Sequence, residues 1–142
     1  MRPQSIVRFE WLYLASFVIG LLSTAQNWGV RNAMLAGNKD TAHLTWIGPA
    51  TTIVGIVIAL ALWWLVARMG NVVAKWVVVV FAAWAVVLLA VLGYGLVTGR
   101  GEVLPLAIGA LQNILYVVAA AQLFGADTPA WFGEGARVEP VA

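Results

Sequence analysis

The sequence contains 142 residues, which is the size of one ordinary domain. Hydrophobic residues make up 63% of it and charged residues only 10%, too few charges to cover the surface of a water-soluble fold. The lack of cysteine excludes disulfides, iron–sulfur clusters and thiolate metal sites, and a net charge of +2 without a basic run argues against nucleic-acid binding.

Four apolar stretches follow one another along the chain, at about residues 11–28, 44–67, 72–97 and 104–124. A helix needs about 20 apolar residues to cross the hydrocarbon core of a bilayer. Each stretch meets or approaches that length, and none carries Asp, Glu, Lys, Arg or His near its middle. We therefore predict an all-α fold, a polytopic bundle of four transmembrane helices within residues 1–126.

The first stretch also has features of a cleavable signal peptide, because Arg2 and Arg8 precede it and small residues occur near its end. Glu10, however, lies where a signal peptide would be basic. We therefore expect a retained first helix. The longest connection, residues 29–43, follows it, and its 30–36 portion is expected to form a short helix at the membrane surface.

The other connections are short, with a tight turn at residues 69–71 and a link at residues 99–102. After residue 126 the chain is rich in glycine, proline and charge, a composition typical of mobile termini. We expect residues 127–142 to form a mobile cytoplasmic tail, in which Trp131 and Phe132 rest at the membrane interface.

The positions of Trp, Arg and Lys predict how the bundle sits in a membrane. Seven of the eight tryptophans fall at or near the ends of the stretches, as expected for residues that prefer the headgroup level, and only Trp84 lies well inside one. The N-terminal side carries Arg2, Arg8, Arg68, Lys75 and Arg137, and the opposite side carries Arg31, Lys39 and Arg100. Because positive charge accumulates inside, both termini are expected in the cytoplasm.

Small and polar residues recur at helical spacing along one face of each stretch. Helices in lipid associate through close packing of small residues and through interhelical hydrogen bonds, so these faces are expected to meet. They comprise Ser16, Gly20, Ser23, Thr24 and Asn27; Gly48, Thr52, Gly55 and Ala59; Ala82, Ala85, Val86, Leu89 and Gly93; and Gly109, Gln112, Asn113, Tyr116 and Ala120.

Polar side chains are concentrated in the half of the bundle towards the 29–43 connection. The candidate cluster consists of Ser23, Thr24, Asn27, Thr51, Thr52, Gln112, Asn113 and Tyr116. One interpretation is a pocket or vestibule that binds a ligand or passes a solute. The other is a set of interhelical hydrogen bonds, each contributing about 0.6 kcal/mol on average, which is the commoner arrangement in membrane bundles.

The predicted spans carry few groups that perform chemistry. Proton-coupled carriers generally place a carboxylate or histidine within the membrane, whereas Glu10 is at the edge of the first stretch and is expected to pair with Arg8 or Lys75. His43 and Asp40 are expected to be solvated loop residues, with metal ligation as an alternative. We predict no catalytic residue, metal site or cofactor, because phosphate-binding glycine loops, paired carboxylates and a serine triad are all missing from the sequence.

Three short segments carry a resemblance to known proteins. Residues 7–14 read VRFEWLYL, residues 74–76 read AKW and residues 129–132 read PAWF. Together they resemble small uncharacterised four-span inner-membrane proteins of proteobacteria. The resemblance implies a bacterial inner membrane, but it implies no activity and assigns no functional residue.

These observations favour a non-enzymatic accessory or interaction subunit. We expect it to pack against itself as a homo-oligomer, or against a larger membrane complex, with membrane lipids as its other partners. The alternative is a small channel, carrier or lipid-binding module that uses the polar cluster. Replacing Gln112 and Asn113 with leucine distinguishes the two, since it should abolish flux or binding only in the second.

Overall fold

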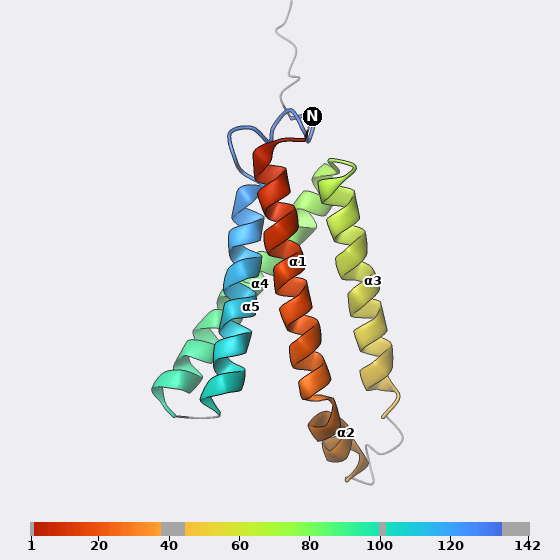
Figure 1. The fold of residues 1–142 in the computed structure, drawn as a ribbon, viewed down its shortest axis with the longest axis vertical. Helices are drawn as coiled ribbons and strands as arrows, with labels where there is room; N and C mark the ends of the chain where they lie inside the picture. Colours follow the sequence, from red (N-terminus) through yellow and green to blue (C-terminus); the bar gives the residue numbers. More distant parts are fainter. Residues whose placement is uncertain (1, 38–44, 100–101, 135–142) are drawn as a thin grey trace, which may run out of the picture.

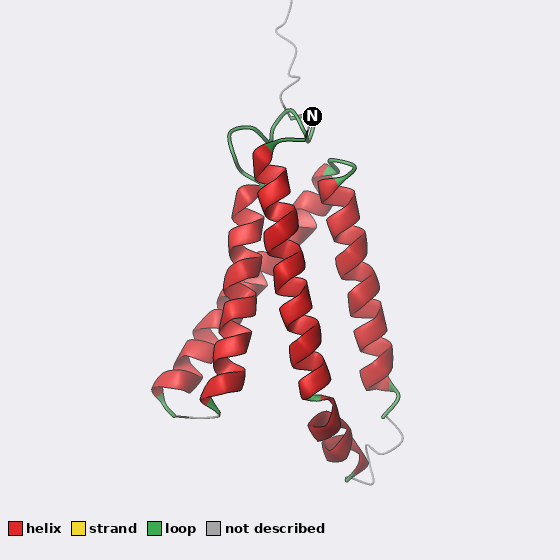
Figure 2. Ribbon diagram, in the orientation of Figure 1, coloured by secondary structure: helices red, strands yellow, loops and turns green. Residues whose placement is uncertain are grey.

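The structure, a computed structural model, describes residues 2–37, 45–99 and 102–134. Across these ranges the chain forms helices joined by turns and contains no strand (Figures 1 and 2). The helices are α1 (Gln4–Gln26), α2 (Trp28–Ala36), α3 (Ile47–Ala67), α4 (Val72–Val97) and α5 (Val103–Gln122). Four of them, all except α2, are long and apolar enough to cross a membrane. The predicted all-α fold with four spanning helices is therefore confirmed, and the chain is a multi-pass membrane protein.

Local sequence explains where these helices begin and end. Pro3 directly precedes α1, with φ of −57°, and Pro49 and Pro105 occupy the first turns of α3 and α5, where their missing N–H groups cost little. Asn71 caps α4 by accepting a hydrogen bond from the Ala74 backbone N–H at 3.0 Å. The bounds of α4 coincide with the predicted third stretch, whereas α1 begins seven residues earlier than the first stretch.

The helix α2 follows α1 after a break at Asn27. The side chain of Asn27 donates to the Ser23 carbonyl at 2.9 Å, and its backbone has φ of −87° and ψ of 0°, outside the helical range. The chain therefore changes direction, and α2 lies beyond the lower ends of the long helices in Figure 1. The expected short helix within residues 30–36 is present and begins two residues earlier.

The buried core lies at one end of the bundle, which we call the N-terminal end. The beginnings of α1 and α4 meet there with the ends of α3 and α5. The buried side chains are Ile6, Phe9, Tyr13, Leu62, Val66, Ala67, Ala74, Val78, Ala82, Ala119, Ala120, Leu123 and Phe132. Small residues on α4 and α5 allow these helices to approach closely, as expected for packing in lipid.

Residues 125–134, which we call the covering segment, lie over this end of the bundle. Phe132 is 5% exposed and Thr128 is 1% exposed, and the Thr128 hydroxyl donates to the Leu123 carbonyl at 3.0 Å. The Trp131 indole N–H donates to the Val66 carbonyl on α3 at 3.0 Å. This packing departs from the mobile tail predicted from residue 127, because aromatic and hydroxyl side chains hold the segment in place. Residues 135–142 are outside the described part.

Away from the N-terminal end the long helices separate. In Figure 1, α4 runs diagonally behind the bundle, close to α3 at their shared turn and far from it at the opposite end. Apart from Gly48, the buried residues of α3 are Leu62, Val66 and Ala67, all near its C-terminus. Among the described residues, the half of the bundle towards α2 therefore lacks a closed core, and α3 stands apart from α1, α4 and α5 there.

Candidate binding cleft

Two adjoining cavities lie on the inner side of α3. The first, of about 400 Å³, is bordered by all four long helices. The second, of about 320 Å³, lies between α3 and α1 and is bordered by α5 at a single residue, Gln112. Gly55, Ala59 and Gln112 border both cavities. We call the combined space the α3 cleft.

The walls of the first cavity are mainly apolar. Ile58 and Leu62 contribute from α3, and Phe81, Trp84 and Leu88 contribute from α4. Phe81 is 46% exposed and Trp84 is 62% exposed, so the α4 wall forms the rim of the cleft and faces the lipid. Trp84, the one tryptophan that the sequence places well inside a span, therefore lies beside this cavity.

The inner surface of the cleft carries a short row of polar groups. Ser16 on α1 lies opposite Gln112 on α5, and Asn113 and Tyr116 border the first cavity beside it. The Ser16 hydroxyl donates to the backbone carbonyl of Gln112 at 3.0 Å and is itself buried. This bond ties α1 to α5 near the middle of both helices and fixes the backbone from which the Gln112 side chain projects.

A second interhelical bond closes the cleft towards the N-terminal end. The Tyr13 hydroxyl donates to the Ala59 carbonyl of α3 at 3.0 Å, and the Tyr13 ring lies 5.5 Å from that of Tyr116. Our candidate cluster omitted Tyr13 and Ser16. The available indication was their spacing with Gly20 along α1, which places all three on one face of the helix.

The structure brings only part of the predicted cluster together. Thr24, Thr51, Thr52 and Gln112 border the second cavity, and Gln112, Asn113 and Tyr116 border the first. A third cavity, of about 360 Å³, lies near Trp28 and also involves Thr24 and Thr52. Neither Ser23 nor Asn27 borders any of these three cavities. The role of the cluster as a binding site stays a prediction.

Most cluster side chains form hydrogen bonds within their own helices. Thr24 donates to the Gly20 carbonyl at 2.8 Å, Thr52 to the Gly48 carbonyl at 2.9 Å and Asn113 to the Gly109 carbonyl at 2.8 Å. Hydroxyl and amide groups commonly satisfy themselves in this way, four residues back along a helix. The bonds that do connect helices come instead from Tyr13 and Ser16, and both end on backbone carbonyls.

The small-residue faces meet in some places and remain apart in others. A Cβ atom on Gly20 would lie 2.6 Å from the Gln112 amide nitrogen, and one on Gly109 would lie 3.4 Å from Leu92. In contrast, a Cβ on Gly55 would have no neighbour within 4 Å. The faces of α1 and α5 therefore pack together as expected, whereas the face of α3 borders open space.

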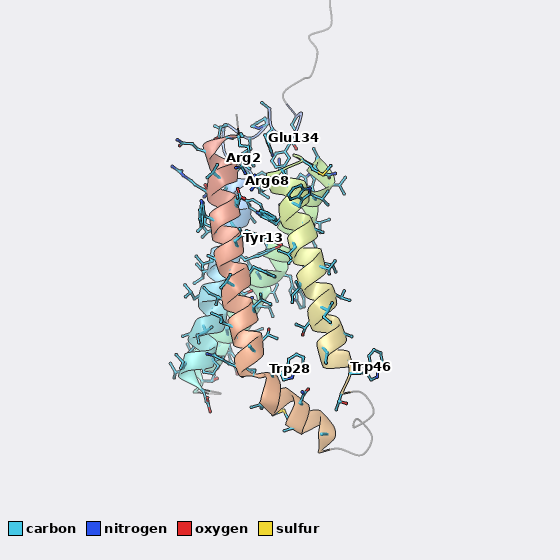
Figure 3. All side chains as sticks on the ribbon, turned by 45° about the vertical axis from the view of Figure 1, so that its right-hand side comes forward. Arg2, Tyr13, Trp28, Trp46, Arg68 and Glu134 are labelled. Atoms are coloured by element: carbon cyan, nitrogen blue, oxygen red, sulfur yellow. The ribbon has the colours of Figure 1, made fainter. Side chains whose placement is uncertain are left out.

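Charged side chains gather at the N-terminal end, outside the cleft. Glu10 accepts from Arg2 at 2.7 Å and from Arg68 at 2.9 Å, and Figure 3 shows these arginines beside Glu134 at one end of the bundle. The expected pairing of Glu10 with Arg8 or Lys75 is wrong. Arg8 is only two positions away, a spacing that points side chains to different sides of a helix.

Lys75 is enclosed instead by the covering segment. Its ammonium group lies 2.8 Å from a Glu134 carboxylate oxygen, and the Lys75 side chain is only 4% exposed. The same group lies 4.7 Å from the Phe132 ring centre and 4.9 Å from that of Phe124, distances typical of cation–π contacts. One cation thereby joins α4 to Phe124, directly before the covering segment, and to Phe132 and Glu134 within it.

Among the described residues, the opposite end carries the tryptophans Trp28 and Trp46. In Figure 3, Trp28 lies beside the end of α1 and Trp46 beside the beginning of α3. Within residues 2–37, 45–99 and 102–134, no group of three or more His, Cys, Asp or Glu residues is placed to hold a metal ion. The predicted alternative of a metal site at His43 and Asp40 falls outside the described residues.

The arrangement as a whole can bind but offers little for bond-making chemistry. The described residues that border the cleft contribute hydroxyl, phenol and amide groups, apolar side chains and aromatic rings, and none of them carries a carboxylate, imidazole, amine or guanidinium. Comparison of the chain with protein-family models, with curated proteins and with solved structures finds no match.

Proposed function

We propose that this protein is a non-enzymatic membrane protein that binds a small, membrane-soluble molecule in the α3 cleft. The single observation that supports this most strongly is the cleft itself, with cavities of about 400 Å³ and 320 Å³ beside a loosely attached helix. Ligand sites commonly measure about 300–1,000 Å³ and combine mainly apolar walls with a few placed polar groups. The cleft has this composition.

The composition of the cleft also favours binding over proton-coupled transport or catalysis. A group that takes up protons within a membrane is generally a carboxylate or histidine, and the described residues that border the cleft include neither. The nearest carboxylate on α1 is Glu10, which is paired with two arginines at the N-terminal end. The ion pairs of Glu10 and Lys75 therefore lie at that end, outside the cleft.

The proposal extends to location. We place the protein in a bacterial cytoplasmic membrane with the N-terminal end facing the cytoplasm. Arg2, Arg8, Arg68 and Lys75 all belong to that end, and the positive-inside rule favours its retention in the cytoplasm. A reporter enzyme fused to the C-terminus, active only in the cytoplasm, tests this orientation. Activity of a periplasm-specific reporter at the same position would reverse it.

A benzophenone amino acid introduced into the protein tests for a bound molecule. Placed at Phe81, on the rim of the cleft, it should capture one defined membrane component from living cells. Placed at Val73, which is 73% exposed and borders none of the three cavities, it should capture the bulk lipid mixture. Mass spectrometry identifies the molecules cross-linked at the two positions. Capture of the same bulk lipid mixture at both positions would contradict the proposal.

The second candidate function is the accessory or interaction subunit expected from composition. The open face of α3 favours it, because Thr52 and Gly55 form a small-residue surface at which Gly55 has free space. Such surfaces admit a neighbouring helix. Native mass spectrometry from lipid nanodiscs separates the candidates. A second chain or larger partner lost on Gly55→Leu indicates a subunit, and a bound mass of lipid size indicates a ligand-binding protein.

A further inference from the structure

We propose that the occupant of the α3 cleft is a neutral lipid, whose uncharged polar head hydrogen-bonds to the side-chain amide of Gln112. This inference rests on the binding function proposed above and specifies its ligand class. It follows from the position of Gln112, from its hydrogen bonding and from the charges of the cleft.

Gln112 lies where the two cavities meet. It is the one α5 residue that borders both of them, together with Gly55 and Ala59 from α3. Its side chain lies across α1 at Gly20, where a Cβ atom would lie only 2.6 Å from the amide nitrogen and 3.1 Å from the amide carbon. Glycine at position 20 therefore leaves room for the amide in this place.

The Gln112 amide makes no hydrogen bond to any other residue in the described part of the chain, although its backbone carbonyl accepts from Ser16. An amide carries two N–H donors and a carbonyl acceptor, and leaving them unpaired in an apolar setting is costly. The other polar groups nearby differ in this respect, since the Asn113 amide already donates to the Gly109 carbonyl at 2.8 Å. A ligand in the cleft would complete the hydrogen bonding of Gln112.

The depth of the site determines the charge of the head group. Gln112 is the tenth of the 20 residues of α5, so its amide lies near the middle of the span. A charge at that depth is expensive unless an opposite charge accompanies it, and no charged side chain in the described part of the chain borders either cavity. Phospholipids, fatty acid anions and alkylammonium ions are thereby disfavoured. Neutral lipids with a hydroxyl or carbonyl group, which reside in the bilayer interior, fit.

The remaining walls suit the apolar part of such a molecule. Ile58, Leu62 and Leu88 provide aliphatic surface, and Phe81 and Trp84 form a rim that faces the lipid. The ligand can therefore enter sideways from the bilayer, without its head group crossing the headgroup layer.

Photoreactive probes with one alkyl chain and different head groups test the inference. The purified full-length protein in nanodiscs is exposed to an alkyl-diazirine carrying a glycerol, a phosphate or a trimethylammonium head. We expect the glycerol probe to label the α3 and α4 borders of the cleft about tenfold more than either charged probe, the ratio expected for about 1.4 kcal/mol of differential binding. Gln112→Leu should reduce that labelling several-fold, in line with the loss of one or two hydrogen bonds.

Gln122→Leu is the matched control, because Gln122 is on the same helix but borders none of the three cavities. It should leave labelling unchanged. If Gln112→Leu does not fold, Gln112→Met preserves the unbranched shape and removes the same hydrogen bonds. Equal labelling by the three probes, or labelling that is unchanged by the Gln112 substitutions, would overturn the neutral-lipid inference alone. Labelling of the cleft no stronger than that of the lipid-facing residue Val73 would overturn the proposed binding function as well.

Discussion

At the N-terminal end, Phe9, Val66 and Leu123 are fully enclosed, whereas towards α2 the inward-facing Gly55 of α3 has no neighbour within 4 Å of a Cβ position. The first region is held by side-chain packing, by the ion pairs of Glu10 and by the covering segment. In the second, α1 meets α5 at the Ser16 bond and at the close approach of Gln112 to Gly20, and α5 meets α4 at Gly109 and Leu92. The same four helices thus form a packed core at one end and a cleft that begins near the middle of the span.

This difference reflects a property of helices in lipid. Each spanning helix satisfies its own backbone hydrogen bonds, so it does not need neighbours along its whole length. Hydrocarbon is also as good a solvent for leucine as another helix is, so apolar side chains gain little from closing the bundle. A membrane bundle can therefore remain open where a water-soluble one would collapse, and a ligand site can form there at little cost in stability.

The largest expected effect is the difference in stability between two separate variants, each of which truncates one phenylalanine in one of the two regions. Phe9→Ala leaves a cavity in the packed end and should lower the free energy of unfolding by up to about 3 kcal/mol. Phe81→Ala removes the same atoms from the rim of the cleft, where lipid can fill the space, and should cost less than about 0.5 kcal/mol. Reversible unfolding in mixed micelles measures both. Equal losses would mean that the two regions are equally packed.

The next effect concerns the buried cation. Glu134→Ala leaves the Lys75 ammonium without its carboxylate, and we expect a loss of about 2 kcal/mol, between the values for buried and exposed pairs because Glu134 is 36% exposed. The control is Glu102→Ala, at the exposed start of α5, which should change little. The same unfolding measurement applies. A loss at Glu102 as large as that at Glu134 would contradict the role given to the covering segment.

Glycine substitutions test the turn beneath the covering segment. Gly70 has φ of +59° and a Cβ there would collide with the Trp131 carbonyl, so Gly70→Ala should cost about 1–2 kcal/mol. Gly99 has φ of +64° but no neighbour near a Cβ, so it reports the backbone effect alone and should cost less. Gly93→Ala, within α4 and facing open space, should stabilise by about 0.5–1 kcal/mol. A different order of the three stabilities would contradict these assignments.

The smallest effect is a pH dependence at the edge of the covering segment. Hydrogen bonds from the hydroxyl and backbone N–H of Ser5 hold the pKa of Asp127 below its usual range. Because the folded pKa is lowered, the stabilisation is complete above the ordinary carboxyl pKa and is lost as the pH falls through the folded value. Asp127→Asn should therefore unfold at a lower temperature than the unchanged protein near pH 6, and the gap should narrow towards about pH 3. A gap that widens on acidification would reverse this sign.

Hydropathy alone predicts the four spanning helices, because a helix that crosses a bilayer needs a long apolar stretch. The sequence of α4 consists almost entirely of apolar residues. Hydropathy does not predict the start of α1, because the charged residues Arg8 and Glu10 place residues 4–10 outside the apolar stretch. Backbone hydrogen bonding continues through those residues regardless of polarity, and Ile6 and Phe9 become part of the core.

The covering segment was missed for a different reason. Its glycine and proline content predicts mobility, but Trp131 and Phe132 anchor it through contacts with residues more than fifty positions away. Amino-acid composition does not predict such long-range contacts. The candidate cluster is likewise only partly predictable from the sequence, because a threonine hydroxyl in a membrane helix can donate a hydrogen bond to a carbonyl of its own helix or to a neighbouring helix. Thr24 and Thr52 bond their own.

Distances between spin labels test whether the bundle is closed at one end and open at the other. The chain has no native cysteine, so cysteine pairs can be labelled cleanly. One pair replaces Trp64 and Trp76 near the α3–α4 turn, and the other replaces Ile53 and Val87. On each helix, the second labelling position lies eleven residues, about three turns, from the first, so both positions are on the same face. All four side chains are more than half exposed.

In lipid nanodiscs, pulsed electron paramagnetic resonance should give a clearly longer distance for the Ile53/Val87 pair than for the Trp64/Trp76 pair, because α3 and α4 diverge from their shared turn. Similar distances for the two pairs would mean that the helices run side by side throughout. The α3 cleft would then be closed in the membrane, contrary to this account.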